Sequence, residues 1–544
     1  MAGGRRDRSP RAPRCQVEGS GDGRAGISRY AADEEPRGCV VRRHGAAVTV
    51  DQLDARIRQH ARRYGKRQAL VVVNRRSTVS MSWAELDEAT GRVADRISSA
   101  AGSPYCQVAT LVDHDVAEIV ALVAAMRVSA PAAVLNARLP AALQDAQLSR
   151  IRDSGYIPVA GQALTSSWPG LQRPRGMKPP HVALAPHAVL LASGGSTGRP
   201  KLVIDHLIRA APVRPAVARP FLHTGWSAGQ RQIVCSPLYH AAGLTPFVEG
   251  LVAGNTIVVA HPFDASTFGS LIEEQAVDWV QMTPYHMTSL LMSGSGPEGW
   301  KRLPHLVHLA DRCPGRVKRR FHAALGDRKV FEMYGASEGI GMTMARGDEW
   351  EERPGTVGRG FFTLLRIVDD NGRTLGPGAV GEVHMRTGVR HHETYLGAAA
   401  RLRFGPDGFA TLGDVGHLDQ AGYLYLAPRQ LAVINVAGVT VSPGDVEAEL
   451  IEHPQIVDVA VCAQPDGVLG ARVVAVVVPA VTAPTADEVR RWATQRMAPA
   501  QVPSRYVFTA ALPRGDTGKL DRVALSELVR QTTLGKEKDS LCGR

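Results

Sequence analysis

The sequence predicts an α/β protein with a large N-terminal domain and a smaller α+β domain at the C-terminus. Three observations support this prediction: the length of the chain, an alternation of helical and strand patterns, and a change of pattern after about residue 360. A chain of 544 residues is too long for one simple core, because folding units are usually far smaller. At least two domains are therefore expected.

The N-terminal region alternates helical patterns with short apolar runs. Residues 83–97 show the helical pattern, and the apolar runs lie at 69–73, 108–112, 232–236, 256–260 and 279–282. Short apolar strands separated by helices are typical of a parallel sheet with crossover helices. We therefore predict an α/β domain here.

After about residue 360 the chain changes to short strand candidates broken by Gly, Pro and Asp. A boundary is predicted near Arg429, and a compact α+β unit of helices and strands follows it. The expected division is a disordered basic leader at 1–29, an N-terminal domain at 30–428, a C-terminal domain at 433–530 and a tail at 531–544.

Composition favours a folded enzyme over a disordered binder, since 44% of residues are hydrophobic and 21% are charged. The net charge of +12 is partly local, because residues 1–14 hold five arginines and one aspartate. We interpret this segment as a solvated leader, with contact to nucleic acid or a membrane as the alternative. The remaining excess suits a pocket for phosphates, so no nucleic-acid partner is expected.

Two further features bear on the compartment. The seven cysteines are scattered, odd in number and without a C-x-x-C pair, which fits a reducing cytoplasm. The sequence has no apolar run near the roughly 20 residues that span a bilayer, so no membrane span is expected.

The most informative segment runs from Leu190 to Lys201, where an apolar strand enters a loop rich in glycine and hydroxyl residues. Glycines let backbone N–H groups turn inward, hydroxyls add donors and a lysine adds a positive charge, so the loop suits phosphates. A flexible surface turn is the alternative, and a proline excludes the P-loop of nucleotide hydrolases. The candidate phosphate-binding residues are Ser193, Gly194, Gly195, Ser196, Thr197, Gly198 and Lys201.

This segment resembles the phosphate-loop signature of the superfamily of acyl-CoA synthetases, peptide-synthetase adenylation domains and luciferases, nearest the bile-acid-CoA or fatty-acid-CoA ligase branch. Further segments, in the same order as in that superfamily, agree: Tyr334-Gly335-Ala336-Ser337-Glu338, Thr411–Asp414, Arg429 and Leu512–Arg522. The resemblance implies that Glu338 holds Mg²⁺ and that the Tyr334 ring lies by the adenine, with Gly335 and Ser337 beside it. It also implies that Asp414 binds the ribose hydroxyls and that Lys519 is the catalytic lysine.

The same resemblance implies a β-barrel-like part within the N-terminal domain and a mobile C-terminal lid that turns about a hinge at 429–432. Each role has a physical reason. Adenylation brings a carboxylate to a triphosphate, so Mg²⁺ at Glu338 and cations at Lys201 and Lys519 would offset the repulsion. A carboxylate suits a vicinal diol, and Arg429 offers a fork of donors nearby. Taken alone, Asp414 and Arg429 would be a capped turn and a surface ion pair.

Two more segments concern the substrates. The segment Ser236–Gly243 is similar to the Pro-x-x-His segment of the superfamily, which implies that His240 borders the acyl pocket and gates or orients the carboxylate. By itself His240 would be a satisfied core histidine. The stretch ending at Gly438 looks like the wall of the pantetheine tunnel, which favours coenzyme A as the acceptor.

The chain also departs from the superfamily pattern. Asp311 and Arg312 stand where relatives usually have Gly-Gly-Ala-Pro, and the hinge run Gln430-Leu431 carries no charge. We expect these differences to affect substrate identity and the second half-reaction more than adenylation.

The predicted function is ATP-dependent adenylation of a small-molecule acid with release of pyrophosphate, followed by transfer to CoA. The predicted cofactors are ATP, Mg²⁺ and CoA. The alternatives are activation of a small acid such as nitrite with transfer to an arylamine, loading of a carrier protein, and a non-catalytic nucleotide-binding relative. ATP–pyrophosphate exchange distinguishes an adenylating enzyme from a non-catalytic relative. Addition of CoA, a carrier protein or an arylamine distinguishes the possible acceptors.

Overall fold

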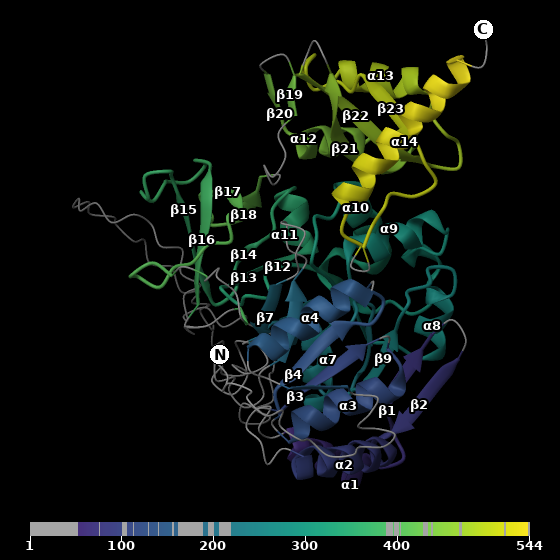
Figure 1. The fold of residues 1–544 in the computed structure, drawn as a ribbon, viewed down its shortest axis with the longest axis vertical. Helices are drawn as coiled ribbons and strands as arrows, with labels where there is room; N and C mark the ends of the chain where they lie inside the picture. The colour runs from purple at the N-terminus through teal and green to yellow at the C-terminus, as the bar shows by residue number, and fades with distance from the viewer. Residues whose placement is uncertain are drawn as a thin grey trace, which may run out of the picture.

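The protein is described by a computed structural model (Figure 1). The described residues are 53–74, 77–100, 106–112, 114–128, 130–139, 141–154, 157–160, 189–193, 201–205, 219–387, 395–396, 402, 404–427, 434–436, 439–466, 470–515 and 518–541.

The largest element is a nine-stranded sheet with the order β14-β13-β12-β11-β10-β8-β9-β1-β2. Its six central strands, from β12 to β1, are parallel, and the strands at both edges are antiparallel. The strands are β1 (Gln68–Val73), β2 (Thr78–Ser82), β8 (Arg231–Val234), β9 (Thr256–Ala260), β10 (Trp279–Met282), β11 (His305–His308), β12 (Val330–Gly335), β13 (Met342–Arg346) and β14 (Arg359–Gly360).

Helices cover both faces of this sheet, as an α/β architecture requires. All five residues of β9 are buried, and they alternate between two cores: Ile257 and Val259 face one, and Val258 faces the other. The helices are α1 (Leu53–Tyr64), α2 (Trp83–Ala100), α3 (Val116–Arg127), α7 (Ala241–Ala253), α8 (Phe268–Glu274), α9 (Pro284–Met292), α10 (Gly315–Leu325) and α11 (Gly347–Glu352), with short 3₁₀ turns at Pro220–His223, Pro297–Gly299 and Asp327–Lys329.

A second sheet has the order β5-β3-β4-β6-β7 and is parallel except at β7. Helix α3 packs against it, and the Asp115 carboxylate caps this helix by accepting the Ala117 N–H at 2.7 Å. The elements are β3 (Cys106–Val112), β4 (Ala132–Asn136), β5 (Ile157–Ala160), β6 (Val189–Ser193), β7 (Lys201–Asp205) and α4 (Ala141–Asp153).

A third, antiparallel sheet contains β15 (Thr363–Val368), β16 (Gly381–Thr387), β17 (Val415–Leu418) and β18 (Leu424–Leu426). It carries Asp414 immediately before β17. Its neighbour in the nine-stranded sheet is β14, which contacts β15. The β-barrel-like part implied by the resemblance stays a prediction.

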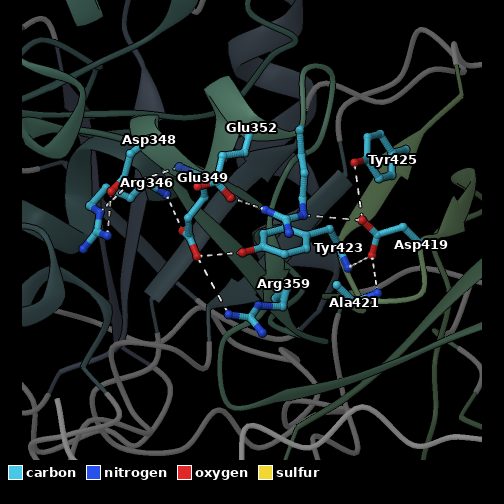
Figure 2. A network of polar contacts seen from close by, with 10 residues as sticks. Arg346, Asp348, Glu349, Glu352, Arg359, Asp419, Ala421, Tyr423 and Tyr425 are labelled. Atoms are coloured by element: carbon cyan, nitrogen blue, oxygen red, sulfur yellow. Dashed lines mark hydrogen bonds and ion pairs between the residues drawn. The ribbon is translucent and has the colours of Figure 1, made fainter.

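A polar network fastens this third sheet to α11 and β14 (Figure 2). The Tyr423 hydroxyl donates to Oε1 of Glu349 at 2.9 Å, and the guanidinium groups of Arg353 and Arg359 lie 4.5 and 4.8 Å from the centre of the Tyr423 ring. Burial, reinforced by the bond to Glu349, raises the pKa of Tyr423 to about 12, so the phenol remains a donor. The network therefore fixes the β17–β18 hairpin relative to the main sheet.

The C-terminal unit lies beyond α9 and α10 in Figure 1, and we call it the lid. Its strands are β19 (Ile434–Val436), β20 (Val439–Val441), β21 (Ile456–Asp466), β22 (Gly470–Pro479) and β23 (Arg505–Phe508), and its helices are α12 (Pro443–Leu450), α13 (Ala486–Thr494) and α14 (Arg522–Leu541). The core between β21, β22 and the helices is rich in valine, which suits strands. Helix α14 continues to Leu541, through most of the segment predicted as a tail.

Candidate active site

The candidate site lies where the carboxyl ends of neighbouring parallel strands meet. His240 follows β8, Tyr285 follows β10, Asp311 follows β11 and Glu338 follows β12. Because parallel strands end at the same edge of a sheet, these segments share one rim. Ligands of open α/β sheets bind in crevices at this edge, so the rim is the expected location of an active site.

The structure brings together Tyr334 and Asp414, which are 80 residues apart. Tyr334 lies in β12, and its hydroxyl donates to Oδ2 of Asp414 at 2.7 Å. Asp414 is buried, and its backbone carbonyl accepts the Val383 N–H at 2.8 Å, so the third sheet holds the carboxylate in place. A buried carboxylate beside a phenol offers acceptors suited to a diol.

A small hollow lies beside this pair. It is lined by Tyr334, Gly335, Ala336, Ile340, Val383, Met385 and Leu412. Apart from the Tyr334 hydroxyl, the side chains there are apolar. With a volume of about 10 Å³, the hollow has room for no more than a water-sized group in this structure.

Glu338 lies four residues beyond Tyr334 and has a partner that the sequence did not reveal. The Tyr395 hydroxyl donates to Oε1 of Glu338 at 2.9 Å. Burial, followed by the negative Glu338 carboxylate, raises the pKa of Tyr395 above its usual range, so the phenol stays protonated. The backbone of Tyr395 in turn pairs with Val203 of β7, the strand that begins at Lys201. The predicted phosphate-binding strand and the predicted metal ligand are therefore neighbours.

The donor set around Glu338 is consistent with Mg²⁺. Within the described ranges, no cluster of three or more His, Cys, Asp or Glu side chains could hold a metal ion. Mg²⁺ usually binds one or two carboxylates together with waters and substrate phosphates, so a single glutamate beside the predicted phosphate loop fits this ion.

The ends of the predicted phosphate loop are described, whereas its tip is not. Ser193 of β6 and Lys201 of β7 are direct partners in an antiparallel pair, so the strands close the loop at its base. The intervening residues Gly194, Gly195, Ser196, Thr197 and Gly198 lie outside the described residues, as do Arg429, the rest of the hinge at 429–432, and Gly438.

His240 occupies the N-cap position of α7 and is half-buried. Its ring lies 4.8 Å from that of Tyr239, and behind Tyr239 the rings of His114 and His261 lie 4.0 Å apart. Burial, followed by the proximity of His261, holds the pKa of His114 well below its usual range. The layer behind His240 is therefore aromatic, and its His114 ring is neutral at physiological pH. The predicted role of His240 beside an acyl group stays a prediction.

Lys519 lies in a tight loop of the lid that reaches the same rim. The Gly515 N–H donates to the Lys519 carbonyl at 2.9 Å, and the Arg514 guanidinium donates to the Gly518 carbonyl at 2.7 Å. Gly518 is buried against Tyr285, and the Lys519 residue beside it is exposed. The lid loop thus delivers Lys519 to the edge where β10 ends.

The segment after β11 differs from the superfamily pattern in a way that the structure makes visible. Ala310 has φ of 84°, a left-handed conformation that favours glycine, the residue usual in this segment. Asp311 and Arg312 are exposed, and the Arg312 N–H donates to Oδ1 of Asp311 at 2.8 Å. Both residues lie shortly after β11, in one of the segments that form the rim of the candidate site.

Sequence reasoning missed three residues that shape this site. Tyr395 contacts Glu338, Tyr285 supports the lid loop, and Arg514 orders that loop. Arg514 lies inside the Leu512–Arg522 segment and could have been singled out there. Tyr395 and Tyr285 carry no local signal, because their roles depend on partners far away along the chain.

Comparison with known proteins gives agreeing results. Residues 57–390 match the family model described as AMP-binding enzyme, and residues 445–519 match that of the AMP-binding enzyme C-terminal domain. Over 353 residues the chain is 29% identical to the medium/long-chain-fatty-acid–CoA ligase FadD8 of Mycobacterium tuberculosis, covering 62% of this chain and 60% of the relative. It is 27% identical to the fatty acid–[acyl-carrier-protein] ligase ScoC of Streptomyces coeruleorubidus, covering 66% and 71%.

Among solved structures, the fold is similar to that of o-succinylbenzoate CoA synthetase from Bacillus subtilis in complex with ATP and magnesium ion. The TM-score is 0.65 with 22% sequence identity, and 86% of this chain and 98% of that chain are covered. The predicted fold, a large α/β region followed by a smaller α+β domain, is confirmed.

Within the described part of the chain, no helix has the length and apolar character needed to cross a membrane. Because the first family model covers more than half of its length, the chain belongs to the AMP-binding enzyme family.

Proposed function

We propose that the protein is an AMP-forming acid ligase that adenylates a small-molecule carboxylic acid at this rim and transfers the acyl group to coenzyme A. The observation that carries the proposal is that three distant parts of the chain meet at one rim: the Tyr334–Glu338 segment, Asp414 and the Lys519 loop. The similarity to a CoA ligase and to a synthetase solved with ATP and magnesium supports ATP, Mg²⁺ and CoA as the ligands.

Each group would perform one task. The Asp414 carboxylate would accept the ribose hydroxyls, with Tyr334 holding its other side. Glu338, oriented by Tyr395, would hold Mg²⁺, which neutralises phosphate charge when bound. Lys519 would place a positive charge at the meeting point of carboxylate and α-phosphate, where negative charge repels negative charge in the ground state.

The proposed reaction has two steps. A carboxylate oxygen bonds to the α-phosphorus as the bond to pyrophosphate breaks, which yields an acyl-adenylate. The CoA thiol, as thiolate, then bonds to the acyl carbon, and AMP leaves. His240 would orient the carboxylate, which is already ionised at neutral pH and needs no base. We also propose a cytoplasmic location, because the scattered cysteines fit a reducing compartment.

ATP–[³²P]pyrophosphate exchange over a panel of aryl, fatty, steroid and inorganic acids tests the first step. We expect exchange with at least one organic acid and its dependence on Mg²⁺. CoA, a carrier protein and an arylamine are then added separately to the responsive acid. Exchange without formation of a thioester from CoA would overturn the proposal that CoA is the acceptor. Formation of a product with the arylamine would favour a diazo-forming ligase. Formation of a product with the carrier protein would favour an enzyme that loads carrier proteins. Absence of exchange with every acid would contradict the enzyme itself.

A further inference from the structure

The lid rests on the N-terminal region through the side chain of Arg316, in the first turn of α10. Its guanidinium donates to the Val457 carbonyl at 2.6 Å and to the His453 carbonyl at 3.4 Å. Both carbonyls belong to the lid: His453 lies between α12 and β21, and Val457 is the second residue of β21. Hydrogen bonds from a charged donor are stronger than neutral ones, so this side chain is a substantial contact between the two units.

A second contact lies under the catalytic loop. Gly518 is buried and has φ of 77°, and a Cβ built there would lie 2.2 Å from Cβ of Tyr285. Real Cβ atoms do not approach so closely, so only glycine allows the loop to settle on Tyr285 in this way. Tyr285 is in the first turn of α9, directly after β10, and therefore belongs to the rim of the candidate site.

The two contacts are connected inside the lid. Asp458 follows Val457, and the Arg514 guanidinium binds both of its carboxylate oxygens, with Nη2–Oδ1 at 2.8 Å and Nε–Oδ2 at 3.0 Å. Arg514 also donates to the Gly518 carbonyl, one residue before Lys519. A continuous chain of polar contacts thus leads from Arg316 to the backbone of the lysine.

We propose that Arg316 and Tyr285 form a two-point seat that holds the lid in the orientation in which Lys519 reaches the site. Both are positioning residues: they act through the lid loop and not on the reacting atoms. This inference rests on the proposed function, because the seat is expected to favour the adenylation step over the transfer step of that reaction. Once the lid turns for the second step, the seat must open, so the strength of these contacts sets the balance between the two half-reactions.

Arg316→Ala tests the first point, and Arg320→Ala is the matched control. Arg320 lies on the same helix, is exposed and pairs with Glu298 of its own region. We expect Arg316→Ala to slow ATP–pyrophosphate exchange about tenfold, since that is the loss of about one charged hydrogen bond. Transfer from a supplied acyl-adenylate to CoA should remain at the parental rate or rise. A variant that slows both half-reactions equally, or neither, would overturn the role of Arg316.

Tyr285→Ala tests the second point, with Tyr285→Phe as control because the ring and not the hydroxyl faces Gly518. We expect the alanine variant to lower exchange several-fold and to spare transfer, and the phenylalanine variant to retain more exchange than the alanine variant because it keeps the ring. Gly518→Ala should show the same split in a stronger form. Equal activity of Tyr285→Ala and the parent would remove Tyr285 from the seat.

Small-angle X-ray scattering of the full chain without substrates provides a readout that does not need an active enzyme. The scattering curve of Arg316→Ala should depart from that of the parent toward a more extended particle, whereas the Arg320→Ala curve should superimpose. If the acid panel gives no exchange yet Arg316→Ala still releases the lid, the proposed function fails and the seat stands. If exchange occurs and all three curves superimpose, the seat fails and the function stands.

Discussion

The two ends of the candidate site are held in different ways. At the end where we propose that the nucleoside binds, called the nucleoside end below, Tyr334 and Asp414 come from two sheets of the N-terminal region that are fastened together by the network around Tyr423 (Figure 2). At the other end, Lys519 belongs to the lid, and Arg316 and Tyr285 connect its loop to the rest of the protein. The first end is therefore built into the fold, while the second depends on the arrangement of two domains.

The sharpest test of this difference is Lys519→Ala. We expect adenylate formation to slow by a factor of about 10² to 10³, since one positioned cation aimed at developing charge is worth that much. ATP affinity should remain nearly unchanged, because the nucleoside end does not involve the lid. ATP–pyrophosphate exchange and calorimetric ATP titration measure the two quantities. Parental exchange in this variant would show that Lys519 lies outside the active site.

The second prediction concerns the proposed metal ligand. Glu338→Gln should lower Mg²⁺-dependent turnover about tenfold, because an amide oxygen lacks the charge that a hard cation prefers. Raising Mg²⁺ should restore part of the loss. Tyr395→Phe is the control: it removes the hydrogen bond to Glu338 and keeps the carboxylate, so its effect should be smaller. A Mg²⁺ titration of exchange activity distinguishes them, and identical curves for Glu338→Gln and the parent would contradict the metal role.

The nucleoside end can be tested with Asp414→Asn, Tyr334→Phe and the double variant. Each single change should raise the KM for ATP, with Asp414→Asn the larger at about tenfold. Because the two side chains share one hydrogen bond, the double-mutant cycle should give a coupling energy of about 1 kcal/mol. Additive effects would mean that the pair does not act as a unit.

The smallest expected effect concerns stability. Tyr423→Phe removes the hydrogen bond to Glu349 and should lower the free energy of unfolding by about 1 kcal/mol. Tyr423→Leu should cost more, because Arg353 and Arg359 also lose the aromatic face. Urea denaturation measures both. Equal midpoints for the leucine and phenylalanine variants would show that the ring face contributes nothing.

Much of the fold could be predicted from local patterns. The apolar run at 256–260 forms β9 with the predicted bounds, and the run at 279–282 forms β10, because short apolar runs that contain β-branched or aromatic residues suit strands buried on both faces. Tyr334, Glu338, Asp414 and Lys519 were singled out in another way, because the short segments that contain them resemble signatures of the superfamily.

The sequence by itself determined the family, the succession of elements and the residue types available at the rim, since these follow from patterns only a few residues long. The tertiary structure decided which of those residues are neighbours. The Tyr334–Asp414 bond joins residues 80 positions apart, and Tyr285 meets Gly518 across more than 200. Contacts over such separations depend on how four sheets pack and on where the lid settles, which no local pattern of side chains specifies.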